Sequence, residues 1–115
     1  LELLPRDMLK IGQMVLNDGK YDHKQIVSKE WLKESTSCKV TTHIENDNYG
    51  YQWWNITLNS NNKPYNCIWA NGMGSQFIYI IPELDVVIVT TGYNYEFDSW
   101  AITTGISKYL YLLDN

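Results

Sequence analysis

Apolar residues are most concentrated between residues 65 and 91, where their pattern predicts three short antiparallel strands, at 65–70, 76–81 and 86–91. Residues 71–75 link the first two strands and contain an Asn-Gly pair and a second glycine, which is typical of a tight hairpin turn. The next link runs from Pro82 to Asp85, two residue types that favour a turn. We therefore expect a three-stranded meander.

Both faces of this meander are apolar. Phe77, Tyr79 and Ile81 alternate with Ile78 and Ile80, and residues 86–89 contain no polar position. A sheet with one face in water would alternate apolar and polar side chains. We therefore expect protein to cover both faces, which makes the meander the centre of a layered domain.

Helical spacing appears on either side of the meander. Met8, Ile11 and Val15 share one face of a helix that starts at Pro5 and stops at Gly19.

A second, short helix is predicted after the capping residue Ser28, with Trp31 and Leu32 buried, and a final helix is predicted over residues 97–113. Residues 49–56 alternate and are rich in aromatic side chains, so we expect one more strand there.

These elements predict an α+β fold, in which an antiparallel sheet of residues 49–56 and 65–91 is flanked by helices within a single domain covering residues 1–115. Hydrophobic residues make up 44% of the chain, which argues against disorder. The net charge of −4 argues against a nucleic-acid partner, because phosphate binding needs a basic surface. No apolar run approaches the roughly 18 residues of a membrane span.

Metal and redox chemistry find little support in the sequence. His23 and His43 have no partner at a metal-ligand spacing, so we expect surface histidines, no metal site and no cofactor. Cys38 and Cys67 are not closely spaced, and either buried or half-buried thiols or a single disulfide would fit.

Nucleophile motifs are scarce as well. Ser60 and Lys63 form a Ser-x-x-Lys string, but it lies in an Asn-rich loop, whereas its chemistry needs the start of a helix. We interpret it as a chance match. At Gly72 and Met73, exposed amides next to a strand end could stabilise an oxyanion, although a plain hairpin turn explains the same residues.

Four segments together resemble the C-terminal part of the class C β-lactamase-like serine hydrolases, within the serine β-lactamase and penicillin-binding-protein superfamily. They are PRDMLKIGQMVLNDG at 5–19, KQIVSKEW at 24–31, YGYQWW at 49–54 and the NGMGSQF…PELD stretch of 71–85. Each segment is weak alone, but their order and spacing extend across most of the chain.

The resemblance implies a partial β-lactamase-like fold and a set of site residues. Ala70, Asn71 and Gly72 occupy the position of the family's Lys-Thr-Gly strand motif, and the Met73 backbone N–H becomes half of an oxyanion hole. Ala70, Asn71 and Gly74 would line the substrate. Alanine at the usual lysine position makes β-lactam hydrolysis less expected than ester, amide or peptide hydrolysis.

The family's nucleophilic Ser-x-x-Lys and its tyrosine base have no acceptable copy here. The chain begins with Leu1, so we expect it to be a fragment whose N-terminal half lies upstream and which is inactive alone. The resemblance implies a bacterial parent, exported or in the cell envelope. A non-catalytic penicillin-binding-like sensor or structural module is the alternative, and self-association through an unpaired strand edge is a further expectation.

Overall fold

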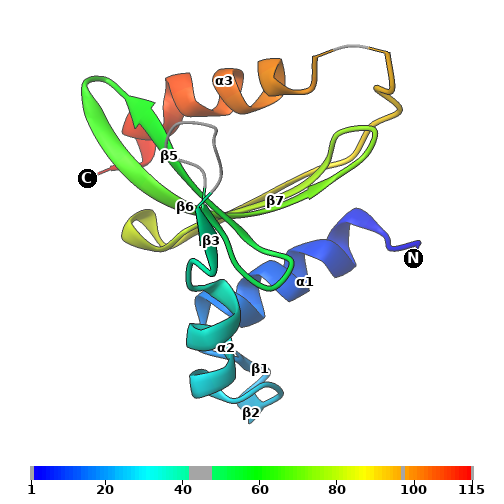
Figure 1. Cartoon of the computed structure of the whole chain (residues 1–115), viewed down its shortest axis with the longest axis vertical. Coiled ribbons are helices and arrows are strands. Elements are labelled where there is room, and N and C mark those ends of the chain that lie inside the picture. Colours follow the sequence, from blue (N-terminus) through cyan, green and yellow to red (C-terminus); the bar gives the residue numbers. More distant parts are fainter. Residues whose placement is uncertain (1, 42–47, 97, 115) are drawn as a thin grey trace.

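The computed structural model describes residues 2–41, 48–96 and 98–114, and its centre is a six-stranded antiparallel sheet (Figure 1). The strands follow one another in the sheet in chain order, so every neighbour is joined by a direct connection. They are β3 (Val40–Thr41), β4 (Asn48–Tyr49), β5 (Trp54–Ser60), β6 (Lys63–Gly72), β7 (Gln76–Ile81) and β8 (Val86–Thr90). A separate hairpin consists of β1 (Lys20–Tyr21) and β2 (Lys24–Gln25).

Helices lie on both sides of this sheet, as Figure 1 shows. They are α1 (Pro5–Leu16), α2 (Lys29–Thr36) and α3 (Trp100–Tyr109), with 3-10 turns η1 (Pro82–Leu84) and η2 (Leu110–Leu113). The predicted α+β class is confirmed.

The central strand β7 is buried on both of its faces. Ile78 and Ile80 pack with Val15 of α1 and Leu32 of α2 in one core. Residues of the opposite parity pack in a second core, which contains Phe77, Tyr79, Ile81 and Leu110 among others. The expectation that the meander is covered on both faces is confirmed.

Helix α1 lies very close to the sheet because Gly12 faces it. A Cβ atom at this position would stand 2.5 Å from Val87 Cγ1 and 2.9 Å from Ile78 Cγ2. Any larger residue must therefore push the helix or the strands apart.

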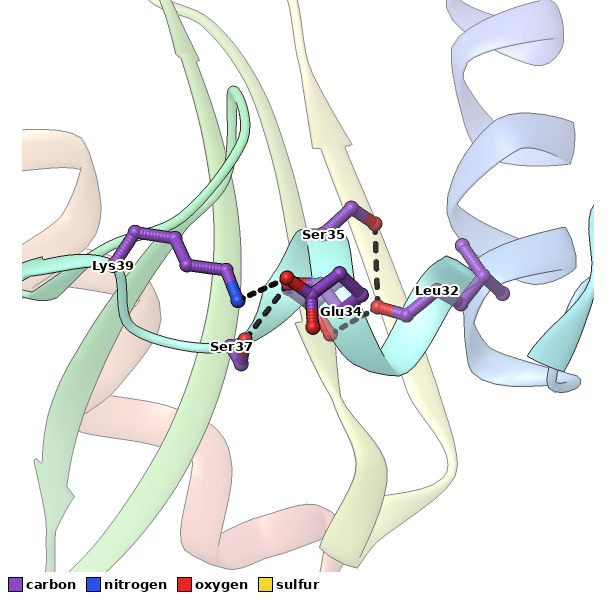
Figure 2. Close-up of polar contacts among 6 residues, drawn as sticks. Leu32, Glu34, Ser35, Ser37 and Lys39 are labelled. Atoms are coloured by element: carbon purple, nitrogen blue, oxygen red, sulfur yellow. Dashed lines mark hydrogen bonds and ion pairs between the residues drawn. The ribbon is translucent and has the colours of Figure 1, made fainter. Parts of the chain in front are cut away.

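Serine hydroxyl groups form hydrogen bonds with the backbone at both ends of helix α2. Ser28 Oγ accepts a hydrogen bond from the Trp31 backbone N–H at 3.1 Å, which confirms the predicted cap. At the other end, Ser35 Oγ donates to the Leu32 carbonyl and Ser37 Oγ donates to the Glu34 carbonyl (Figure 2). The predicted burial of Leu32 is confirmed.

The predicted burial of Trp31 is wrong. Its side chain is 53% exposed and stacks on Tyr51, with 5.8 Å between ring centroids. Leu32 takes the inward position on α2, so Trp31 lies on the outer surface of this short helix.

Helix α3 is attached to the second core by polar as well as apolar contacts. The buried hydroxyls of Tyr79 and Thr103 lie 2.9 Å apart, and Ser107 Oγ donates to the Asn59 carbonyl. The predicted helix 97–113 is corrected to α3 followed by η2, while position 97 lies outside the described residues.

The predicted strand 49–56 is also corrected, because the chain turns between β4 and β5. The Gly50 N–H donates to the Trp53 carbonyl at 2.7 Å, and Gln52 has a φ of 70°. A Cβ at Gly50 would overlap the carbonyl oxygens of Ser35 and Ser37 at the end of α2. The close approach to α2 therefore leaves no room for a side chain at position 50.

Strand β6 is longer than predicted at both ends. The Asn-rich segment 59–63 shrinks to a two-residue turn at Asn61 and Asn62, both with positive φ. Ser60 and Lys63 are paired across this hairpin, so the Ser-x-x-Lys string is not in a helix.

No helix among the described residues is long and apolar enough to span a membrane, and no cluster of three metal-ligand side chains occurs in those residues. His43 lies outside them. Both cysteines are free. Cys67 is buried, as one reading expected, whereas Cys38 is exposed.

The close contact at Gly12 can be tested against a matched glycine. We expect Gly12→Ala to lower the free energy of unfolding by about 1–3 kcal/mol, because the steric cost exceeds the gain in helix propensity. Gly105→Ala in α3 meets no atom within 4 Å, so it should raise stability by roughly 0.5–1 kcal/mol. Urea unfolding of both variants measures the difference, and equal effects would contradict the packing argument.

The thiols should differ in reactivity. Burial raises the pKa of the Cys67 thiol to about 12, so little nucleophilic thiolate exists at pH 8. Iodoacetamide should therefore label Cys38 in the native protein and label Cys67 only after denaturation, as mass mapping of peptides would report. Rapid native labelling of Cys67 would show that the second core opens readily.

Candidate functional site

The candidate site lies at the end of β6, where one side of the strand has no partner. Pairing with β5 ends at Trp54 and Trp69, whereas pairing with β7 continues to Gly72 and Gln76. Within the described residues, positions 70–72 are therefore bonded only on the β7 side. Such an edge can accept an extended ligand through backbone hydrogen bonds.

The turn after β6 brings backbone amides to this edge. It consists of Met73, Gly74 and Ser75, and the φ angles of Gly74 and Ser75 are 81° and 71°. The sequence prediction placed the Asn-Gly pair in the turn, but Asn71 and Gly72 belong to β6. The left-handed positions fall on the next two residues.

Gly72 matters for space in this hairpin. A Cβ on it would stand 3.1 Å from the Gln76 carbonyl oxygen and 3.2 Å from Gln76 Cβ, so a side chain would crowd the paired strand. The Met73 side chain is 81% exposed. Among the described backbone bonds outside helices and strands, none is donated by the Met73 N–H.

The segment after β8 holds the turn in place. The Asn94 N–H donates to the Gly74 carbonyl at 3.2 Å, and Thr90 Oγ1 donates to the Ser75 carbonyl at 3.1 Å. Gln76 Nε2 donates to the Gly92 carbonyl. These bonds engage carbonyl groups in and next to the turn, and none of the described bonds outside helices and strands is donated by the Met73 N–H.

Tyr95 covers Gly74 directly. A Cβ on Gly74 would lie 2.9 Å from Tyr95 Cζ, and Tyr95 also packs edge-on against Tyr93. The combination of positive φ and an aromatic ring above it makes glycine strongly preferred at this position.

A groove with a volume of about 680 Å³ opens beside the turn, between the sheet and the N-terminal part of the chain. Its lining consists of Glu2, Leu3, Met8, Ile11, Gln52, Trp53, Ala70, Met73, Gln76, Ile78 and Tyr95. Ala70 and Met73 connect the groove with the strand end and the turn.

The structure thus brings together only some of the predicted site residues. Ala70 and Met73 line the groove, and Gly72 and Gly74 shape its hairpin. Asn71 is exposed and, by strand alternation, lies on the face opposite Ala70.

Of the groove residues, only Ala70 and Met73 were predicted for the site; the sequence reasoning missed the others, among them Trp53, Gln76 and Tyr95. The sequence pattern places Trp53 and Gln76 in strands and predicts no helix or strand at Tyr95. For Tyr95, the sequence offers only an aromatic side chain in a loop that contains Gly92. Such a side chain does not indicate which other residue it will contact. The convergence of these three side chains depends on the turn at Gly50 and on the path of residues 91–96.

A separate cluster of titratable groups joins β6 to the C-terminal turn. Lys63 Nζ lies 2.6 Å from Asp114 Oδ2 and 2.8 Å from Glu83 Oε1, and the Tyr65 hydroxyl donates to Asp114. The bonds from Lys63 and Tyr65 lower the pKa of Asp114. Ser60 Oγ accepts from the Tyr111 N–H. These contacts fasten the chain end, so Ser60 and Lys63 have a structural explanation.

Of the comparisons with known proteins, the one with solved structures gives matches, and these concern the fold. Neither the models of protein families nor the curated proteins give a match to this sequence. Among solved structures, 22 chains match. One is assigned as a 6-aminohexanoate-dimer hydrolase of Bacillus anthracis, with 24% identity and a TM-score of 0.66. The chain shares the fold of part of a hydrolase. The match covers 95% of this chain and 28% of the hydrolase, so this chain corresponds to just over a quarter of that protein.

The contact between Gly74 and Tyr95 predicts energetic coupling. Gly74→Ala should lower the free energy of unfolding by about 1–3 kcal/mol, since it adds both left-handed strain and a steric clash. Left-handed strain should account for most of this cost, because the exposed Tyr95 ring can shift away from a new Cβ. Tyr95→Ala removes the ring, so in the double variant the cost of Gly74→Ala should shrink slightly, to the strain alone. Urea unfolding of the four proteins gives this cycle. Strictly additive effects would contradict the contact.

Proposed function

We propose that this chain is the C-terminal part of a serine acyl hydrolase of the β-lactamase and penicillin-binding-protein superfamily. Three observations support the proposal: the four sequence segments in family order, the shared fold with part of a hydrolase, and the geometry at the end of β6. The geometry carries the most weight. A strand edge with one free side adjoins a turn amide and a groove, which is what binding of a carbonyl substrate requires.

In this proposal the backbone N–H of Met73 stabilises the oxyanion. A serine from a preceding segment attacks an ester or amide carbonyl, and a lysine–tyrosine pair of that segment transfers the protons. Negative charge develops on the carbonyl oxygen as the tetrahedral intermediate forms. The Met73 amide donates to that oxygen, and the N–H of the serine supplies the second donor. One such donor contributes about 10²–10³ in rate.

The strand end positions the substrate for this attack. Residues 70–72 of β6 offer backbone groups to an extended substrate, while the clamp from Thr90, Gly92 and Asn94 keeps the turn rigid. Rigidity matters because an oxyanion donor acts by preorganisation. Within the described residues, no serine at the start of a helix is followed by a lysine three positions later, so the proposal assigns turnover to the longer protein.

A proline at Met73 tests the amide directly. Met73→Pro removes the N–H, whereas Met73→Ala keeps the N–H and removes the exposed side chain. In the full-length protein that contains this chain, we expect the proline variant to lower kcat for p-nitrophenyl esters by about 10²–10³ relative to the alanine variant. Melting temperatures of both variants serve as the folding control.

The outcomes separate three explanations. A loss confined to the proline variant supports the oxyanion role, and an equal loss in both variants assigns the effect to the side chain. Full activity in a folded proline variant would overturn the role of this amide. If the full-length protein neither hydrolyses esters nor reacts with a fluorophosphonate probe, the non-catalytic sensor or structural module becomes the better explanation.

A further inference from the structure

The groove beside β6 is lined mainly by uncharged side chains. Among the described residues, its lining contains no lysine, arginine or histidine, and Glu2 is the one charged side chain. The walls are formed by Met8 and Ile11 of α1 and by Ile78 of β7, with Trp53 beside them. A ligand in this groove therefore meets apolar surface and, at one point, a carboxylate.

The hydrogen-bond donors of the groove carry no positive charge; they are the side chains of Gln52, Trp53, Gln76 and Tyr95. Gln76 uses its amide N–H₂ group on the Gly92 carbonyl, so that donor is already engaged. Gln52 lies in the exposed turn before Trp53. A carboxylate entering the groove would lose water without gaining a cation, and such burial is strongly unfavourable.

Ala70 contributes to the uncharged character of the groove at the end of β6. Its side chain lines the groove and packs against the core that contains Ile78 and Ile80. It lies two residues before Gly72, on the same face of the sheet as Gln76. Its small methyl group leaves space for a ligand and adds no charge where the groove meets residues 70–72 of β6.

We infer that this groove binds the acyl part of the substrate as an uncharged, apolar chain and discriminates against a terminal carboxylate. The inference rests on the proposed hydrolase function and adds the substrate class to it. The occupant follows from complementarity: apolar walls remove an apolar chain from water, and Glu2 repels an anion. The scissile carbonyl then lies at the Met73 turn, with the chain extending along Met8 and Ile11.

Two esters of equal chain length test the inference in the full-length protein. The p-nitrophenyl ester of hexanoic acid is neutral, and the p-nitrophenyl half-ester of adipic acid ends in a carboxylate. We expect kcat/KM for the hexanoate to exceed that for the adipate by about tenfold or more, since the unpaired carboxylate must be desolvated.

Variants at Ala70 locate the source of the preference. Ala70→Lys places a cation in the groove and should reduce the hexanoate-to-adipate ratio several-fold, while Ala70→Gln adds similar bulk without charge and should not favour the adipate. Asn66→Lys adds the same charge on the exposed part of β6 outside the groove and should keep the wild-type ratio. A ratio near one in the wild-type protein would overturn the inference, whatever the variants do.

A binding measurement separates this inference from the hydrolase proposal. Saturation-transfer NMR with hexanamide and with adipamic acid reports binding without turnover. If hexanamide binds preferentially but no ester is hydrolysed, the groove assignment stands and the hydrolase proposal fails. If esters are hydrolysed without discrimination, the hydrolase proposal stands and the inference fails. Absence of both binding and hydrolysis overturns both.

Discussion

The structure depends on a single strand that cannot face water on either side. In β7 the side chains of Ile78 and Ile80 point to one face, and those of Phe77, Tyr79 and Ile81 point to the other; all five are buried. Burying apolar surface of this extent requires a layer of helix on each side of the sheet. Helices α1 and α2 form one layer, and α3 with η2 forms the other (Figure 1). One face of the sheet is therefore covered by the N-terminal part of the chain and the other face by the C-terminal part.

The candidate site shares its residues with this architecture. Met8 and Ile11 pack in the α1 core and also form the groove wall, and Ala70 does the same from the sheet. The close contact at Gly12 sets the distance between helix and sheet, and with it the width available beside them. Stability and the shape of the groove are therefore linked through α1, while the turn of residues 73–75 is held by the segment after β8.

The fold class was accessible from the sequence because its signals are local. Alternation in 76–81 and the apolar run at 86–89 specify buried strands, and the spacing of Met8, Ile11 and Val15 specifies a helix. The errors occurred where a contact from elsewhere in the chain decides the backbone. Residues 49–56 read as one strand, but Gly50 approaches the end of α2 and the chain turns there. Trp31 read as buried, but Leu32 takes the inward position on α2, so Trp31 stays at the surface and stacks on Tyr51.

The sequence by itself determined the α+β class and the meander, because strand period, turn residues and helix spacing are encoded in neighbouring positions. Only the tertiary structure decided that Gly74 and Ser75, rather than Asn71 and Gly72, take the left-handed conformation. It also decided that Trp53, Gln76 and Tyr95 meet at the same groove. These features arise from contacts between segments far apart in the chain, and no local pattern records which segments will meet.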